Sequence, residues 1–337
     1  MPSTKARQKI LLLFDFPQKP PADGDFIPFL RSEGWENEWH VYQTLKKLGY
    51  DVKPFGLHND IDLLFKEVRL NRPDLVFNLC ESFQGDREHE GHVAAFLDLL
   101  GLPYTGASAQ TLMLCKDKSL TKSILAQHNI RVPRFIVSRR SSPLRSLKDW
   151  EFPAFIKPLN LEASEGIAQN SLAQNENQAL QRIQFLHEKY QCDVIVEEYI
   201  DGREIYVGVL GRDNITVFPS RELHFRSIPA GKPRFASYRA KWDDRYRKRW
   251  GIVNGNAKKL SPTLQERIKE CCHRIYSIFQ MRGYGRIDLR LSPQGEVVFL
   301  EANPNPSIAK DDDFAQAAKQ AGFDYESLIA KIVKLAA

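Results

Sequence analysis

The sequence predicts an α/β protein of more than one domain, and three observations support this class. The 337 residues correspond to roughly two domains at about 150 residues each, and three small ones are equally allowed. Hydrophobic residues make up 42% and charged residues 27% of the chain, which is typical of globular proteins and excludes disordered and fibrous classes. Short apolar runs alternate with amphipathic stretches along the first hundred residues, as in a parallel α/β sheet.

The first domain is expected to cover residues 1–112. The short apolar run 10–15 indicates a buried strand, and the proline-rich segment 17–34 indicates a long loop. The later elements are a helix at 36–48, a strand at 52–55, a helix at 61–70, a strand at 75–79 and a helix at 89–100. This alternation of strands and helices predicts a small parallel sheet.

Two further units are expected at 113–200 and 201–337. The first is predicted to contain helices at 114–128 and 177–190 and strands at 135–138, 154–157 and 194–199. The second is predicted to contain strands at 205–210, 215–220, 285–291 and 297–301, with a helix at 263–281 and closing helices. Within it, residues 226–254 are rich in Lys and Arg and are predicted to form a loop.

Charge and cysteine content exclude several classes of partner and site. The net charge of +6 favours anionic ligands such as nucleotides, but it is too diffuse for a nucleic-acid surface. The five cysteines contain no CxxC pair, so we expect neither a disulfide framework nor a zinc knuckle, and a reducing cytoplasm fits best. No apolar stretch approaches the roughly 18 residues of a membrane span. We therefore expect a cytoplasmic protein without nucleic-acid or membrane partners.

Polar residues on two neighbouring predicted strands are the strongest local signal. Arg286, Asp288 and Arg290 alternate along one strand, so their side chains share a face. Glu301 and Asn303 do the same on the next strand. Pairing the two strands would gather two carboxylates and an amide oxygen, a ligand set that suits Mg²⁺ together with substrate phosphates. The alternative is a solvated hairpin face with incidental acids.

Two other segments carry polar residues at strand ends. Lys157 ends an apolar strand, where its ammonium group would lie at a cleft, although a solvated strand cap has the same pattern. The stretch 195–204 can read an adenine base through its backbone groups and bind ribose through an acid after a turn, and a plain hairpin is the alternative. The pattern GxxxxGK[ST] does not occur in the sequence, so a Walker-type nucleotide site is excluded.

Six segments, in this order and spacing, resemble the ATP-grasp superfamily and specifically its D-alanine:D-alanine ligase-like branch. They are Pro103-Tyr104-Thr105-Gly106, the lysine segment 116–122, Phe155-Ile156-Lys157-Pro158, Val196-Glu197-Glu198-Tyr199-Ile200, the stretch 235–242, and Gly285-Arg286-Ile287-Asp288 with Leu300-Glu301-Ala302-Asn303. The resemblance covers residues 76–336 and, more faintly, the first domain. It implies an ATP-grasp fold, with a Rossmann-like pre-ATP-grasp domain at 1–112 and α+β grasp subdomains at 113–200 and 201–337.

The resemblance also implies where ATP binds. It places Lys118 and Lys157 on the phosphates and Lys241 on the γ-phosphate, carried by the loop 226–254, which is expected to be poorly ordered without ligands and to close over ATP. The adenine and ribose are assigned to Glu197, Glu198, Tyr199, Ile200 and Glu204.

Metal binding and the chemistry follow from the same resemblance. Two Mg²⁺ ions, with Mn²⁺ as an alternative, are assigned to Asp288, Glu301 and Asn303. In the implied reaction a substrate carboxylate attacks the γ-phosphate, and an amine captures the resulting acylphosphate. Arg286 and Lys241 are the implied catalytic residues, with Arg286 stabilising the oxyanion of the tetrahedral intermediate.

The first-substrate pocket departs from the family pattern. Members that form dipeptides anchor the first D-alanine through a Glu, a Ser and a Tyr. Here Glu36 is the candidate acid, but Ala163 stands at the serine position and Trp242 at the tyrosine position. The neighbouring Ser164 is the candidate replacement hydroxyl. We therefore expect a first pocket that is larger or differently polar than one made for alanine.

The second-substrate pocket departs as well. Asp312 stands where dipeptide ligases carry a serine that binds the second carboxylate, and Ser307 stands where they carry a glycine. A carboxylate at 312 would repel a substrate carboxylate by about 1 kcal/mol at 4 Å even in water. The alternative is that the aspartates 311–313 cap a helix that begins near residue 314.

Three functions follow from these observations. The first is an ATP-dependent ligase that joins amino acids or peptide-like substrates other than two D-alanines. The second is a D-alanine:D-alanine ligase of cell-wall synthesis, and the third is an ATP-binding protein or small-molecule kinase without C–N ligation. A homodimer is compatible with the resemblance.

Overall fold

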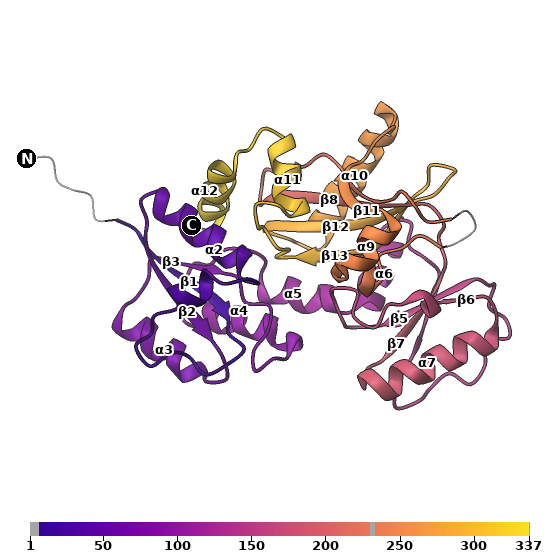
Figure 1. The fold of residues 1–337 in the computed structure, drawn as a ribbon, viewed down its shortest axis with the longest axis horizontal. Helices are drawn as coiled ribbons and strands as arrows, with labels where there is room; N and C mark the ends of the chain where they lie inside the picture. Colours follow the sequence, from indigo (N-terminus) through magenta and orange to yellow (C-terminus); the bar gives the residue numbers. More distant parts are fainter. Residues whose placement is uncertain (1–6, 230–232, 337) are drawn as a thin grey trace, which may run out of the picture.

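The computed structural model describes residues 7–229 and 233–336. The outer ends of the predicted first and third domains, and part of the loop expected to close over ATP, lie outside the described residues. Figure 1 shows three parts: an N-terminal α/β domain, a small central sheet that carries α7, and a larger sheet between them. We retain 1–112, 113–200 and 201–337 as the proposed domain limits.

The N-terminal domain is the predicted parallel sheet. Its strand order is β2 (Asp51–Leu57), β1 (Lys9–Asp15) and β3 (Leu75–Asn78), with both neighbours parallel to β1. Residues 10–14 of β1 are all buried because helices cover both faces of the sheet. The helices are α2 (Glu36–Lys47), α3 (Ile61–Leu70) and α4 (Glu90–Leu99), preceded by the 3₁₀ turn η1 (Arg87–His89).

The proline-rich segment 17–34 is more ordered than the predicted loop. It contains the short helix α1 (Ile27–Leu30), which begins with a proline in its first turn. Phe26 and Phe29 pack edge-on against Phe16, with ring centroids 5.3 and 5.1 Å away, and the Trp35 ring lies 5.6 Å from Phe16. The segment is therefore held by an aromatic cluster on the N-terminal sheet.

The central part is a four-stranded antiparallel sheet with its own core. The strand order is β4 (Phe135–Ser138), β7 (Val194–Glu198), β5 (Ala154–Pro158) and β6 (Leu172–Ala173). Helix α7 (Glu176–Tyr190) covers one face of this sheet and buries Ile183 and Leu186 against it. Two helices lead into this part, α5 (Ala109–Lys116) and α6 (Lys118–Gln127). The single helix predicted at 114–128 is interrupted because the Asp117 side chain caps α6.

The C-terminal part is built on a larger antiparallel sheet. Its order is β11 (Ile252–Asn256), β10 (Arg221–Phe225), β8 (Arg203–Gly211), β12 (Gly283–Leu291) and β13 (Val297–Pro304), with β9 (Thr216–Val217) beside β8. Helix α10 (Pro262–Ile278) packs on one face, while α11 (Asp313–Gln320) and α12 (Tyr325–Ala336) close the chain. No helix in the described residues is long and apolar enough to cross a membrane.

The segment 226–254 differs from the predicted loop. Its described residues form α8 (Tyr238–Trp242), α9 (Asp244–Trp250) and part of β11. Ser237 and Asp243 accept backbone hydrogen bonds as N-caps, so both short helices begin at the residue types that favour a helix start. The prediction of a loop was therefore wrong for α8, α9 and the start of β11, whereas residues 226–229 and 233–237 form no helix or strand.

Two glycines bring the N-terminal domain against the large sheet. Gly106, with φ of 90°, ends the Pro103-Tyr104-Thr105-Gly106 segment, and Gly283, with φ of 74°, begins β12. A Cβ atom on Gly283 would lie 2.9 Å from the Gly106 Cα. Beside this contact the Asn305 side chain accepts a hydrogen bond from the Ala107 N–H at 2.8 Å. Only residues without a side chain allow this approach.

Candidate active site

A narrow cleft separates the central sheet from the large sheet. Its walls contain the predicted nucleotide residues together with the metal strands, namely Phe155, Lys157, Ser164, Glu197, Glu198, Tyr199, Ile200, Glu204, Lys241, Asp288, Arg290 and Glu301. The free volume is about 70 Å³. Ligand sites are commonly about 300–1,000 Å³, so the walls have to part before a nucleotide enters.

The two predicted phosphate lysines are buried and bind protein groups, and of the two Lys157 lines this cleft. The Lys118 ammonium donates to the carbonyls of Leu159 and Leu161 at 3.2 and 2.6 Å. The Lys157 ammonium lies 3.0 Å from Glu197 Oε2. Burial lowers the pKa of Lys118, whereas at Lys157 burial is outweighed by Glu197, which raises the pKa. Lys157 is therefore held as a cation at the cleft.

The predicted adenine and ribose residues occupy different positions in the cleft. Glu197 is buried, and its carboxylate contacts lysines. Glu198 pairs with Arg131 and accepts a hydrogen bond from the Arg134 N–H at 3.1 Å. Both carboxylates are therefore engaged by protein groups, and Tyr199 and Ile200, which follow the strand, line the cleft beside them. The Tyr199 ring lies 6.4 Å from Phe155 in a stacked arrangement.

Arg290 is a cleft residue to which sequence reasoning gave no role. It is 3% exposed and donates to the Ile200 carbonyl at 2.9 Å and to Glu204 Oε2 at 3.0 Å. Glu204 also accepts from Tyr206 Oη at 2.9 Å and from the Ala236 N–H at 3.0 Å. The sequence contained a signal for this role, because Arg290 alternates with Arg286 and Asp288 on the predicted strand and therefore shares their face.

The predicted metal residues are brought together by strand register. Asp288 lies opposite Glu301 and Arg286 opposite Asn303 in the antiparallel pair β12–β13. Arg286 binds Asp288 through two hydrogen bonds of 2.7 and 2.9 Å. Burial raises the pKa of Asp288 despite this arginine. At Glu301 burial is outweighed by Lys118, Lys241 and nearby cations, which lower the pKa.

These residues fit a hard cation that also binds phosphates. Asp288, Glu301 and Asn303 offer oxygen donors only. The Asn303 amide nitrogen is buried without a hydrogen-bond partner in the part of the chain that is described, so no protein acceptor fixes the orientation of this amide. Within the described ranges no group of three or more His, Cys, Asp or Glu residues gathers to bind a metal. The site thus provides few protein ligands, as Mg²⁺ sites shared with substrate phosphates do.

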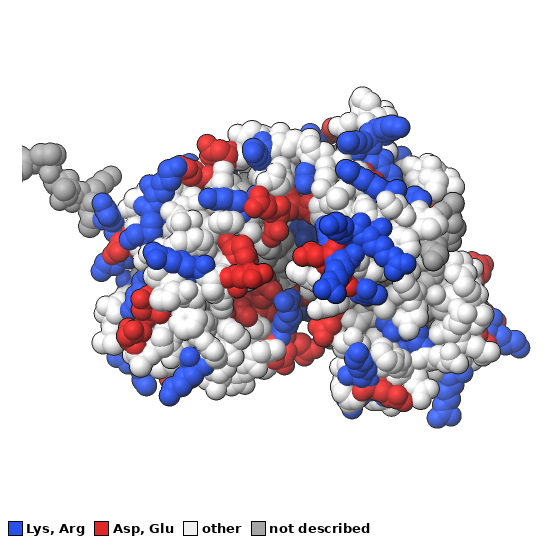
Figure 2. All heavy atoms as spheres, in the orientation of Figure 1, with Lys and Arg blue, Asp and Glu red and all other residues white. Residues whose placement is uncertain are grey.

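A second and larger cavity, of about 710 Å³, lies between the N-terminal domain and the large sheet. It adjoins the nucleotide cleft at Lys241, which lines both. Its charged lining residues are the acids Glu81, Glu90, Glu162, Asp311, Asp312 and Asp313 and the cations Arg87, Lys241, Arg247 and Arg286. Figure 2 shows the acidic side chains gathered along this hollow, with basic side chains on the α8–α9 side. The cavity is large enough for an amino acid or short peptide.

The predicted first-substrate residues are only partly assembled. Ala163 and Trp242 line this cavity, and the Trp242 indole N–H donates to the Ala163 carbonyl at 2.9 Å. Ser164 lines the nucleotide cleft instead. Glu36 does not line the cavity, because its carboxylate accepts the Gly34 N–H at 3.1 Å at the exposed start of α2. The structure therefore does not place Glu36 with the other predicted substrate residues.

Glu38, two residues later, points toward the acidic region instead. Burial raises its pKa to about 7, with further increases from Glu81 and Asp15. Glu81 has a raised pKa for the same main reason, even though Arg87 lies 3.0 Å from its carboxylate. The N-terminal wall therefore holds more carboxylates than its cations neutralise.

The second-substrate candidates Ser307 and Asp312 both line the cavity. Asp312 stands at the N-cap position of α11, yet its side chain accepts no hydrogen bond from the helix. Burial raises its pKa, and the nearby Ser307 side chain opposes this shift. The neighbouring Asp313 pairs with Arg221 at 3.1 Å. Among the aspartates 311–313 that were expected to cap this helix, Asp312 holds the N-cap position without a side-chain hydrogen bond, and Asp313 lies in the first turn.

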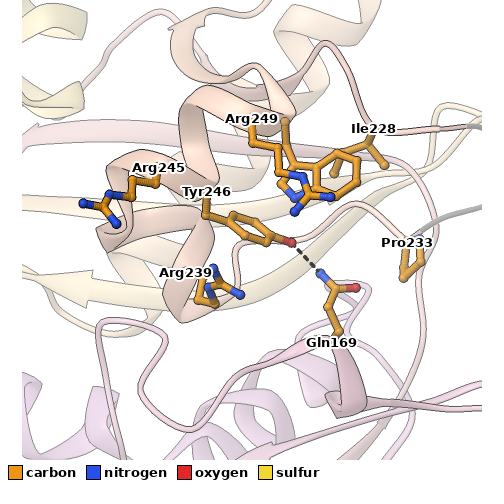
Figure 3. Close-up of a pocket in the computed structure, with 8 residues that line it drawn as sticks. Gln169, Ile228, Pro233, Arg239, Arg245, Tyr246 and Arg249 are labelled. Carbon is orange, nitrogen blue, oxygen red and sulfur yellow. Dashed lines mark hydrogen bonds between the residues drawn. The ribbon is translucent and has the colours of Figure 1, made fainter.

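The α8–α9 segment is fastened to the loop that carries Ser164. The Tyr238 N–H donates to the Ile167 carbonyl at 3.0 Å, in addition to the bond between Trp242 and Ala163. A third bond joins Gln169 Nε2 to Tyr246 Oη at 3.1 Å, at the edge of a cavity of about 360 Å³ drawn in Figure 3. We call these three bonds the α8–α9 latch.

Comparison with known proteins identifies the family. Residues 124–334, more than half of the chain, match the family described as D-ala D-ala ligase C-terminus. The chain is 32% identical over 303 residues to the uncharacterized protein y4sG of Sinorhizobium fredii, covering 88% of this chain and 86% of that protein. It is 27% identical over 299 residues to D-alanine–D-alanine ligase B of Clostridium perfringens, covering 87% of this chain and 90% of that protein.

Solved structures share the fold. The D-alanine–D-alanine ligase of Bacillus anthracis superimposes with a TM-score of 0.76 at 21% identity, covering 98% of this chain and 97% of that one. The VanG D-Ala:D-Ser ligase of Enterococcus faecalis gives a TM-score of 0.71 at 19% identity, covering 98% of this chain and 100% of that one. The chain therefore belongs to the D-alanine–D-alanine ligase family of ATP-grasp enzymes.

Proposed function

We propose that this enzyme is an ATP-dependent ligase that joins the carboxylate of one amino acid or peptide to an amine other than that of D-alanine. The observation that carries the reaction type is the cleft in which Lys157 and Lys241 line the same walls as Asp288 and Glu301. Phosphoryl transfer requires little covalent chemistry from protein but much neutralisation of negative charge. This convergence of cations beside an acidic substrate cavity supports ligation.

The proposed roles follow from position. Lys157 would bind the phosphates, the backbone at Tyr199 and Ile200 would read the base, and Glu204 would bind the ribose. Lys118, which donates to the Leu159 and Leu161 carbonyls after the Lys157 strand, would join Lys157 on the phosphates. Asp288, Glu301 and Asn303 would hold Mg²⁺, which when bound would neutralise phosphate charge. Lys241 lines both the cleft and the larger cavity, as expected of a group that follows the transferred phosphoryl.

The bond changes balance with these groups. A substrate carboxylate oxygen attacks the γ-phosphorus, the bond to ADP breaks, and an acylphosphate forms. The nitrogen of the second substrate, after losing a proton, attacks the acyl carbon, and inorganic phosphate leaves as the amide forms. Arg286 lines the substrate cavity, where it can stabilise the oxyanion of the tetrahedral intermediate.

The lining of the larger cavity supports a specificity for amines that are neutral or cationic. The Asp312 side chain makes no hydrogen bond to its helix, and Glu81 and Glu90 line the same cavity. A free carboxylate next to Asp312 would meet like charge in a partly dehydrated site. An amine substrate that lacks a carboxylate, or that carries a second cationic group, would instead gain from these acids.

The decisive experiment measures ADP release with amino acids, amino-acid amides, diamines and short peptides, supplied singly and in pairs. We expect stimulation by a pair but by neither member alone, and faster turnover with neutral or cationic amines. Asp312→Ser should raise any residual ligation of D-alanine, and Asp213→Ser, at an exposed position outside the cavity lining, is the matched control. D-Alanyl-D-alanine formation at about 1 s⁻¹ or faster by the unmodified enzyme would refute the specificity.

D-alanine–D-alanine ligation is the competing function, because several relatives bear that name. The same assay separates the two functions, since the products differ. The proposed cytoplasmic location is supported by cysteines 80, 115, 192, 271 and 272, which are all free thiols.

A further inference from the structure

Lys122 is a buried cation that the proposed reaction does not use. Its side chain is 0% exposed, its ammonium donates to the Leu300 carbonyl, and it lies 5.5 Å from the Phe299 ring centroid. It follows Lys118 by four residues on α6, so both lysines leave the helix from one face. A buried charge is costly unless it is paired, which implies a specific partner.

That partner is Glu197, which also binds Lys157. Glu197 Oε1 lies 3.0 Å from the Lys122 ammonium and Oε2 lies 3.0 Å from the Lys157 ammonium. Both contacts are ion pairs, and Oε1 makes no well-aligned hydrogen bond. Glu197 is 2% exposed, so solvent hardly screens this lysine–glutamate–lysine triad.

The charges of the triad leave one positive charge in excess. One carboxylate is shared between two ammonium groups, and only Lys157 lines the nucleotide cleft. Without Lys122 the carboxylate would neutralise Lys157 alone. The triad would then present a balanced ion pair to the phosphates instead of a net positive charge.

We propose that Lys122 is a positioning residue that fixes Glu197 and keeps Lys157 only partly neutralised, so that the triad attracts the nucleotide phosphates. This inference rests on the proposed ATP site. It concerns phosphate binding and leaves the binding of the adenosine portion unchanged.

The test compares the dissociation constants of ADP and adenosine by titration calorimetry, without Mg²⁺ so that the metal strands do not contribute. We define the preference for ADP as the ratio of the adenosine dissociation constant to the ADP dissociation constant. In Lys122→Met this preference should fall by about tenfold or more, because a charge interaction strong enough to shift a pKa by one unit changes a binding constant about tenfold. In the double variant Lys122→Met with Glu197→Gln the triad again carries one positive charge. Its preference for ADP should return to within about threefold of wild type, because charge attraction governs phosphate binding.

Two controls separate positioning from a structural effect. Lys122→Arg keeps the charge and should retain the preference for ADP. Val68→Ala shortens a buried side chain in the N-terminal domain, far from the cleft, and should leave the preference unchanged even though it lowers stability. If Lys122→Met does not fold, Lys122→Gln supplies the neutral variant.

The outcomes distinguish this inference from the proposed function. Parallel loss of ADP and adenosine binding in Lys122→Met, or failure of the double variant to restore the preference, would overturn the role of Lys122 alone. A wild-type protein that binds ADP no better than adenosine would overturn the proposed ATP site, and this inference with it.

Discussion

Asp288 and Glu301 face each other across two strands, yet their carboxylates differ. Burial raises the pKa of Asp288, whereas lysines outweigh burial and lower the pKa of Glu301. Asp288→Asn and Glu301→Gln should each reduce Mg²⁺-dependent ATP turnover by more than about tenfold, because each removes a charged ligand. Circular dichroism should show an intact fold. Turnover within tenfold of wild type in both variants would exclude the metal role.

Glu38 gives a prediction for stability against pH. Its pKa is raised from 4.5 to about 7, mainly by burial, so the folded state binds a proton that the unfolded chain releases between these values. The free energy of unfolding therefore falls as pH rises from about 4.5 to about 7. Glu38→Gln should remove this dependence on pH. At pH 8 its free energy of unfolding should exceed that of wild type by on the order of 1–2 kcal/mol, a figure reduced because solvent partly reaches Glu38.

Urea unfolding of both proteins at pH 4.5 and pH 8 measures this effect. Glu36→Gln is the matched control, because Glu36 lies exposed at the start of α2 and has a lowered pKa. If the difference in unfolding free energy between Glu38→Gln and wild type is the same at both pH values, the burial of Glu38 is contradicted.

The two glutamates also mark how far residues are predictable from sequence. The alternation of Asp288, Glu301 and Asn303 on adjacent strands was sufficient to bring them together, because strand periodicity fixes the face. Residues two apart on a helix lie about 200° apart, so Glu36 and Glu38 point in opposite directions. Which of the two is buried near Glu81 and Asp15 depends on how α2 packs on the sheet, and the sequence alone does not contain that rotation.

The start of β12 shows a constraint at the scale of an element. Gly283→Ala would place a Cβ 2.9 Å from the Gly106 Cα at a φ of 74°. We expect a loss of about 2–4 kcal/mol in unfolding free energy, from backbone strain and overpacking together. Gly295→Ala, at a φ of 81° with no atom within 4 Å, should lose only about 1 kcal/mol. If denaturant unfolding gives the same loss of unfolding free energy for Gly283→Ala and Gly295→Ala, the close approach of Gly283 to Gly106 is refuted.

The α8–α9 latch makes a second prediction at this scale. The double variant Trp242→Phe with Tyr246→Phe removes two of the three bonds, and each neutral hydrogen bond contributes about 1 kcal/mol. Trypsin should then cut the segment 226–254 faster without ligand, with protection restored by ATP and Mg²⁺. Tyr190→Phe on α7 is the control. Unchanged cutting would show that these bonds do not hold the segment.

The same segment shows why some elements escape prediction. Helices α8 and α9 have five and seven residues, too short for an apolar periodicity to emerge from their charged sequence. Their N-caps Ser237 and Asp243 were the available signals. Long elements with clear apolar faces, such as α3 at 61–70, were predicted with their bounds.

At the scale of the molecule, the hydrophobic cores do not follow the order of the chain. One core combines Ile10 and Leu12 of β1 with Leu328 and Ile332 of α12, and α12 packs beside α2. The central sheet has a separate core around Ile156 and Ile183. In Figure 1 the C-terminal helix accordingly lies against the N-terminal domain, apart from the central sheet.

Deletion of residues 325–337 tests this arrangement. It removes four buried side chains of α12, and at about 1.5–3 kcal/mol each their loss is comparable to the whole stability of a domain. Amide exchange should accelerate in β1 and β3 and stay slow in β5 and β7, whose core is independent. Equal protection of β1 with and without α12 would contradict a shared core.

The shared core has a consequence for folding during synthesis on the ribosome. A ribosome adds about 5–20 residues per second, so roughly 15–60 s separate the appearance of Ile10 from that of Leu328. Throughout that interval the apolar face of the first sheet lacks the helix that finally covers it. The N-terminal domain is thus synthesised first but completes its core last. Until then the nascent chain exposes an apolar surface that chaperones would be expected to shield.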